Sequence, residues 1–153
     1  MKKLVGLAMV LGLVLLLTGV SMAADSNTVT VTANVVGTCK FLTGGTMAFG
    51  GLDPSSGAAK AATVTQPTFW CTKGASYTIS DDLGMYEVGA QRKVKHASLD
   101  EYINYSMSYT ITGTGDGRTV TKTMDIAGTI SFADYQDASA GGYSDTITLT
   151  ISP

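Results

Sequence analysis

Apolar and polar residues alternate along most of the chain after residue 27, while the spacing of an amphipathic helix is hard to find. Successive side chains of a β-strand point to opposite faces, so this alternation predicts strands with one buried face and one exposed face. The pattern predicts seven or eight short strands, within residues 28–36, 47–51, 63–72, 75–80, 92–97, 103–111, 120–132 and 146–151.

Glycine, proline and aspartate separate the predicted strands. Residues 50–62 and 134–142 have the composition of loops, and residues 113–117 predict a hairpin turn. Pro67 interrupts a predicted strand, and because proline has no N–H to donate to a ladder it indicates an edge or a bulge. Short strands at this spacing are typical of an all-β, immunoglobulin-like antiparallel β-sandwich, which is the fold that we predict.

The first 23 residues have the organisation of a signal peptide. A positively charged start, residues 1–3, precedes an apolar run over residues 4–20, and small residues surround the expected cleavage point after Ala23. Cleavage after Ala24 fits as well. The alternative is an uncleaved membrane anchor, since the apolar run approaches the roughly 20 residues that span a bilayer.

The charge of the mature chain argues against one class of partner. With 8 basic and 12 acidic residues it has a formal charge of −4, and the basic residues do not cluster. Nucleic-acid binding needs a basic stripe or patch. No nucleic-acid partner is therefore expected.

Cys39 and Cys71 are the two cysteines of the chain. An even number of cysteines in an exported domain predicts a disulfide. This disulfide would close a loop of roughly 32 residues and contribute about 3 to 4 kcal/mol. Two free thiols or a metal-binding pair are the alternatives, but supporting ligands are lacking because His96 is the only histidine.

Enzymatic chemistry and metal binding have little support in the sequence. A nucleophile needs a nearby base, and His96 lies in a charged stretch, where we expect a solvated surface residue. Asp81 and Asp82, or Asp134 and Asp137, could offer oxygen ligands to calcium, but they lack the spacing of an EF-hand loop. We predict no catalytic residues, no metal site and no cofactor.

The aromatic residues have two interpretations. We expect Trp70 to pack in the core against the disulfide, and Tyr105 and Tyr109 to share a core face with Met107. Alternatively, exposed aromatic rings, with Tyr102 among them, could form a platform that stacks on sugars.

The first predicted strand, residues 28–36, leaves two possibilities open. It can pair within its own domain, or it can complete the sheet of a neighbouring chain. In the second case main-chain hydrogen bonds supply affinity and alternate side chains fill pockets. The last predicted strand, residues 146–151, carries no charge, and an uncharged edge strand is open to pairing with another chain.

A series of short motifs follows the first predicted strand. In order, they are Gly37-Thr38-Cys39, Phe49-Gly50, Cys71-Thr72-Lys73-Gly74-Ala75-Ser76-Tyr77, Arg92, the strand 105–109, Gly128-Thr129-Ile130 and Gly142-Tyr143-Ser144-Asp145-Thr146-Ile147. In this order and cysteine placement the chain resembles the spore coat protein U family, whose members include subunits of archaic chaperone–usher pili. The resemblance covers nearly everything after Gly37.

The resemblance implies an incomplete sandwich that lacks one strand. A periplasmic chaperone would lend that strand first, and at the outer-membrane usher the N-terminal extension of the next subunit would replace it. Residues 24–36 would be this extension and residues 37–153 the domain. The donor residues pointing inward would be Val29, Val31, Ala33 and Val35.

The resemblance thus implies a structural, non-enzymatic subunit of a surface pilus. Its partners would be neighbouring subunits, the chaperone and the usher. The chain would pass through the periplasm to the cell surface and support adhesion or biofilm formation. The alternative function is a self-contained secreted coat protein or carbohydrate-binding sandwich.

Overall fold

The computed structural model describes residues 23–153. All of the predicted signal peptide except Ala23 lies outside the described residues. A leading segment ending at Ala33 and a folded unit, Asn34–Pro153, are separate units of the structure. In residues 23–153, no helix has the length and apolar character needed to cross a membrane.

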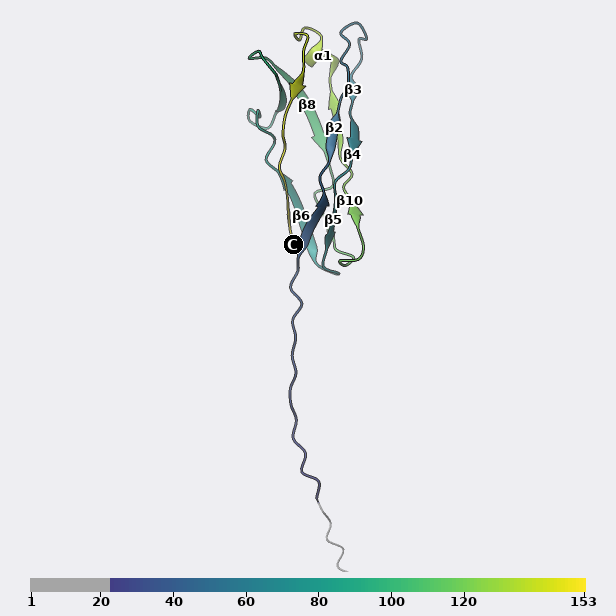
Figure 1. The fold of residues 1–153 in the computed structure, drawn as a ribbon, viewed down its shortest axis with the longest axis vertical. Helices are drawn as coiled ribbons and strands as arrows, with labels where there is room; N and C mark the ends of the chain where they lie inside the picture. The colour runs from purple at the N-terminus through teal and green to yellow at the C-terminus, as the bar shows by residue number, and fades with distance from the viewer. Residues whose placement is uncertain (1–22) are drawn as a thin grey trace, which may run out of the picture. The chain divides into compact units, whose positions relative to one another are not determined.

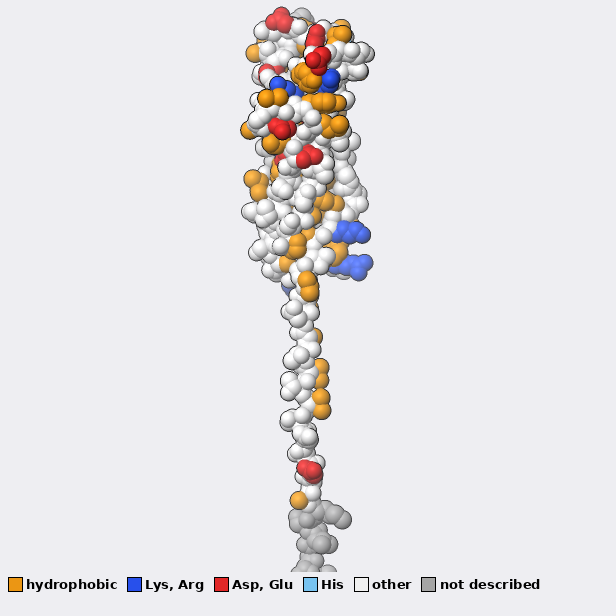
Figure 2. All heavy atoms as spheres, turned by 90° about the vertical axis from the view of Figure 1, so that its left-hand side faces the viewer, with side chains coloured by type: hydrophobic (Ala, Val, Ile, Leu, Met, Phe, Trp, Pro, Cys, Tyr) orange, Lys and Arg blue, Asp and Glu red, His pale blue; other side chains and the backbone are white. Residues whose placement is uncertain are grey.

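In the leading segment, residues 23–33 form neither helix nor strand. Val29 and Val31 are 88% and 87% exposed. Most apolar side chains of this segment lie along one side of it (Figure 2). The alternation that the sequence predicts is therefore present, without a strand partner.

The folded unit is built from short β-strands and one short helix (Figure 1). The strands are β1 (Cys39–Thr43), β2 (Thr46–Ala48), β3 (Lys60–Ala61), β4 (Thr63–Thr65), β5 (Thr68–Cys71), β6 (Ser76–Asp81), β7 (Arg92–His96), β8 (Tyr102–Ser108), β9 (Thr112–Thr114), β10 (Lys122–Thr123), β11 (Ala127–Ile130), β12 (Tyr143–Ser144) and β13 (Leu149–Ser152), with helix α1 (Phe132–Tyr135) between β11 and β12.

All strand pairs are antiparallel, which confirms the predicted all-β antiparallel fold. The largest sheet has the order β12-β7-β8-β11-β3. The smaller sheets have the orders β1-β5-β10, β13-β6-β9 and β2-β4.

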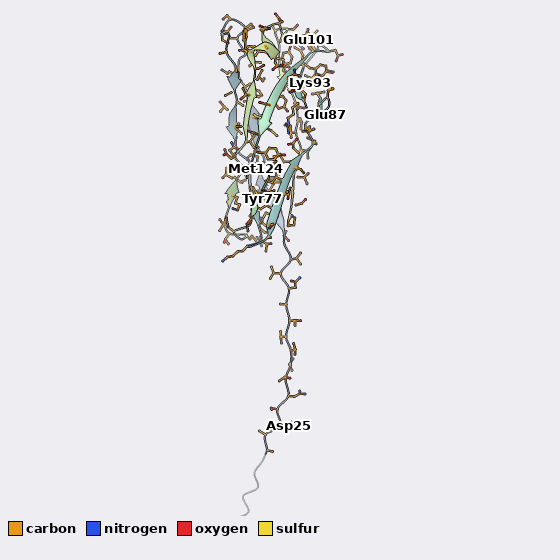
Figure 3. All side chains as sticks on the ribbon, turned by 180° about the vertical axis from the view of Figure 1, so that it is seen from behind. Asp25, Tyr77, Glu87, Lys93, Glu101 and Met124 are labelled. Carbon is orange, nitrogen blue, oxygen red and sulfur yellow. A yellow bond between two sulfur atoms is a disulfide. The ribbon has the colours of Figure 1, made fainter. Side chains whose placement is uncertain are left out.

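The core consists of two clusters of buried side chains. One cluster joins β5 to β6, where the rings of Phe69 and Tyr77 meet edge to face at 5.1 Å. Tyr77 and Met124 of this cluster lie in the interior of the unit (Figure 3). The other cluster contains Ile103, Tyr105, Ile130 and Tyr135. Met47 and Met107 pack against both clusters and so connect them.

Pro67 breaks the predicted strand 63–72 into β4 and β5, as its missing N–H leads one to expect. The side chain of Gln66 replaces the lost pairing at the break. Its Nε2 donates to the carbonyl of Ile126 at 2.7 Å, and the backbone N–H of Ile126 donates to its Oε1 at 2.8 Å.

Three expectations about individual elements are wrong. Residues 113–117 do not form a hairpin turn, because β9 pairs with β6 and places Gly113 opposite Tyr77. β1 is not among the predicted strands, since its five residues alternate too weakly to be recognised. Phe132 belongs to α1, not to a strand that continues from Ile130.

Candidate functional site: an open groove between two sheet edges

Two of the sheet edges of the folded unit, one at β2 and one at the C-terminal strands, have no strand neighbour. β2 pairs with β4 only, so its other side has no strand neighbour. At the opposite edge, β12 pairs only with β7, and β13 only with β6. Within residues 23–153, therefore, no ladder joins β2 to the C-terminal run that contains β12 and β13.

A cleft of about 1290 Å³ lies between these two edges. One wall comprises residues 43–52, which include β2, and the other comprises residues 138–149, which follow α1, contain β12 and end at the first residue of β13. In Figure 1 the first wall belongs to the dark blue part of the chain and the second to the yellow part. The two walls are about 100 residues apart in the sequence but face each other across the cleft.

The interior of the cleft is apolar. Met47, Phe49 and Leu52 of the first wall and Ile147 of the second pack against the core while remaining partly exposed. The ring of Phe49 meets that of Tyr105 at 6.0 Å. Further apolar residues that line the cleft are Val64, Val94, Ile103, Met107 and Ile130, which lie in strands, and Ile126, which precedes β11.

Residues 145–148 of the second wall belong to no strand, although β12 precedes them and β13 follows. Carboxylates hold their outer side. The N–H of Thr148 donates to Asp82 Oδ1 at 2.9 Å, and the N–H of Thr146 donates to Asp145 Oδ1 at 2.8 Å. Among the described residues, no hydrogen bond is recorded to the N–H or C=O of Ile147, which lies between them.

The cleft can therefore bind an extended peptide better than a compact small molecule. Small-molecule pockets are typically enclosed and measure about 300–1,000 Å³. This cleft is larger and runs between two sheet edges with unpaired backbone groups. A strand laid into it would gain main-chain hydrogen bonds at the walls and bury alternate apolar side chains inside.

A buried polar network lies behind the second wall. Nη2 of Arg92, at the start of β7, contacts both carboxylate oxygens of Asp81 at 2.8 and 2.7 Å. The hydroxyl of Tyr109 donates to Asp81 Oδ2 at 2.6 Å, and that of Tyr105 donates to Asp145 Oδ2 at 2.6 Å. The bonds of Asp81 thus join β6 to β7 and to the residue after β8, and the Tyr105–Asp145 bond joins β8 to the second wall.

Burial and hydrogen bonding together shift the pKa values of these groups. Burial alone would raise the pKa of Asp81, but the hydrogen bonds from Tyr109 and Arg92 outweigh it and lower that pKa. Burial, with the hydrogen bond to Asp81, raises the pKa of Tyr109 to about 12. Burial and the Asp145 carboxylate likewise raise the pKa of Tyr105. Both phenols therefore stay protonated and donate at neutral pH.

Cys39 and Cys71 form the predicted disulfide. The two residues face each other in the β1–β5 ladder, and Cys71 is buried in the first core cluster. The disulfide therefore staples β1, whose chain continues into the first wall of the cleft, to β5.

Two single-residue expectations are corrected. His96 is buried, not solvated: its Nδ1 accepts hydrogen bonds from the backbone N–H groups of Ser98 and Leu99, each at 3.0 Å. Trp70 belongs to neither core cluster, because β5 turns Phe69 and Cys71 inward and Trp70 to the other face. There the guanidinium of Arg118 lies 5.9 Å from its ring centre.

Three of the four aspartates considered for calcium accept hydrogen bonds from protein donors; Asp134 accepts from Asn104 and Ser131. Asp81 is bound by Arg92 and Tyr109, and Asp82 accepts from Thr148 and Gly84. In the described part of the chain, no three acidic, histidine or cysteine side chains gather as a metal site would require.

The comparisons with known proteins give two findings. A chain in the crystal structure of the CsuC–CsuE chaperone–tip adhesion subunit pre-assembly complex, from archaic chaperone–usher Csu pili of Acinetobacter baumannii, is similar with a TM-score of 0.44 and 18% identity. The match covers 76% of the present chain and 40% of that chain, so the present chain spans less than half of its length. No curated protein sequence matches.

The second finding concerns the family. The Spore Coat Protein U domain matches residues 25–150, which is most of the chain and all but the end of β13. The match agrees with the motifs described above, from Gly37 to Ile147. The chain belongs to the Spore Coat Protein U domain family.

Proposed function

We propose that this chain is a structural, non-enzymatic subunit of a surface pilus that is assembled by donor-strand exchange through a chaperone–usher pathway. The observation that carries the proposal is the apolar groove between two unpaired sheet edges. Membership of the Spore Coat Protein U domain family supports it. The chain is exported through the periplasm and ends at the cell surface, where the pilus supports adhesion or biofilm formation.

The occupant of the groove in the finished fibre is the leading segment of a second copy. Residues 28–36 place Val29, Val31, Ala33 and Val35 at alternate positions, and Val35 is 80% exposed in the single chain. Nine extended residues span about 30 Å, comparable to the ten-residue first wall. Residues 24–36 thus act as the donor extension and residues 37–153 as the acceptor domain.

Before assembly the same groove is filled by a strand of a periplasmic chaperone, and the exchange takes place at the outer-membrane usher. The need for a temporary occupant follows from the exposed core. Each valine that the donor buries contributes up to about 1.5–3 kcal/mol, and an unfilled groove leaves an equivalent apolar surface open to aggregation.

The experiment is a gel of protein sheared from the producing cells, loaded unheated and after boiling, and probed with an antibody to this chain. Wild-type protein should give a ladder of multiples that collapses to one band on boiling. Val31→Asp should abolish the ladder, because a charge cannot enter the apolar groove. Thr30→Asp is the matched control, since Thr30 occupies the other face of the same segment, and should retain it.

A single monomer band from wild-type cells, heated or not, would refute the pilus proposal. It would favour the self-contained coat or carbohydrate-binding sandwich.

A further inference from the structure

The second wall of the groove presents a physical problem. An edge segment without a strand neighbour has few backbone hydrogen bonds to hold it extended, and such segments open easily. Residues 145–148 lie between β12 and β13 and are in no strand themselves. Something other than a ladder must keep them in place while the groove is empty.

Asp145 connects this segment to the rest of the fold. Its Oδ2 accepts the hydroxyl of Tyr105, on β8, at 2.6 Å. Its Oδ1 accepts the backbone N–H of Met85 at 2.9 Å and that of Thr146 at 2.8 Å. One carboxylate thus ties the second wall to a core strand and to the 82–91 loop.

The loop is shaped around this carboxylate. Gly84 has a φ of +94°, and a side chain there would collide with Asp145 Oδ2, so the backbone can approach the carboxylate only because residue 84 is glycine. On the same loop, the backbone N–H of Asp82 donates to the carbonyl of Thr148 at 3.2 Å, and the Asp82 side chain accepts the N–H of Thr148 at 2.9 Å. Both ends of the unpaired segment are therefore held from the outer side.

These contacts use the backbone donors of alternate residues. In an extended chain the N–H groups of residues 146 and 148 point to one side and those of 145 and 147 to the other. The first pair is bound to carboxylates, while Ile147, with no recorded partner in residues 23–153, lies between them and lines the cleft. Residues 145–148 therefore offer an extended backbone edge with which an incoming strand can pair.

We propose that Asp145 is a positioning residue that, through Tyr105 and the N–H of Met85, keeps residues 145–148 extended in the empty groove and so accelerates capture of the donor strand. This inference rests on the proposed function. Once the donor is bound, its own ladder holds the segment. Asp145 should then influence the rate of capture much more than the rate of release.

The test measures the two rates separately. The acceptor is the mature chain carrying Val29→Asp and Val31→Asp, so that it cannot fill the groove of another copy, refolded at low concentration. The probe is a fluorescent peptide with the sequence of residues 25–36. Anisotropy gives the association rate, and a chase with unlabelled peptide gives the dissociation rate.

Asp145→Asn and Tyr105→Phe should each lower the association rate by about tenfold, the effect expected from one charge-assisted hydrogen bond. Dissociation should change by no more than about twofold, because the bound strand holds the edge through its own ladder. Tyr105→Phe keeps the ring that contacts Phe49, so the apolar lining is preserved. Asp116→Asn, which removes an ion pair with Lys122 away from the cleft, is the matched control and should change neither rate.

Hydrogen exchange provides a second readout. In the empty acceptor, the amides of Thr146 and Thr148 should exchange faster in Asp145→Asn than in the parent chain, and the difference should disappear when the peptide is bound. Unchanged association rates, or equal changes in association and dissociation together with a lower melting temperature, would overturn the positioning role. Failure of the parent acceptor to capture any peptide would instead contradict the proposed function.

Discussion

The carboxylate of Asp81 keeps its charge inside the protein because donors surround it. Its side chain is 3% exposed, and it accepts hydrogen bonds from Arg92, from Tyr109 and from the N–H of Leu83. Nε of Arg92 is buried without a recorded partner in residues 23–153. The ion pair between Asp81 and Arg92 is stabilised by the hydrogen bond from Tyr109 as well as by the attraction between the two charges.

Tyr109→Phe should lower the free energy of unfolding at pH 7 by about 1.5–3 kcal/mol, the value of a hydrogen bond to a charged group. The pKa of Asp81 is lowered in the folded protein, so this stabilisation is present above the usual aspartate value and is lost as the pH falls through the lowered one. The difference between variant and wild type should therefore shrink below about pH 4.

Urea unfolding over a series of pH values measures this difference. Tyr102→Phe is the control, because Tyr102 donates to Asp100 at the exposed surface and should change stability by less than about 0.5 kcal/mol. A pH-independent difference for Tyr109→Phe would mean that Asp81 is not the group involved.

Local patterns predict some elements well and others poorly. Alternation predicts β6, β8 and β13 because one face of each strand is more buried than the other, as in the pattern of Ser76–Asp81. The glycines of residues 113–117 predict a hairpin, but β9 pairs with β6, because many backbone paths suit a glycine-rich segment. His96 looks solvated among lysines, and only the fold shows that two backbone N–H groups bind it.

The disulfide is the element-scale feature most open to test. The double substitution Cys39→Ser and Cys71→Ser should lower the free energy of unfolding by about 3–4 kcal/mol, from the loop entropy of a 32-residue separation. Urea unfolding, carried out with and without reductant, measures this loss in the free energy of unfolding. Reductant should destabilise the wild type by a similar amount and leave the double variant unchanged; a response of the variant would point to another target.

The groove forms only when distant parts of the chain come together in the fold, so local sequence patterns could not predict it. Its walls come from residues 43–52 and 138–149, and their approach depends on the order of every strand between them. Asp145 and Tyr105 appear in the sequence only as parts of short motifs, because their contact joins residues 40 positions apart. The signal that could have suggested the groove is the uncharged last strand with its open edge.

An incomplete fold should gain stability from its missing strand by mass action. Peptide 25–36 at a hundredfold excess over its dissociation constant should stabilise the acceptor chain by about 2.7 kcal/mol. The melting temperature should therefore rise with peptide concentration. The matched control is the same peptide with threonine in place of Val29, Val31 and Val35, the valines of the apolar face, and it should have little effect. Equal effects of both peptides would show that the groove does not recognise the apolar side chains of the peptide.

Because few charged residues lie around the groove, the contacts between the subunits of such a fibre should depend little on salt concentration. Residues 28–36 carry no charged side chain, and Asp145 is the one charged residue lining the cleft in the described structure, where it is bound within its own domain. Dissolved salt weakens attraction between exposed charges, but the burial of apolar surface does not depend on that attraction. Links made in this way would therefore hold in seawater as well as in fresh water.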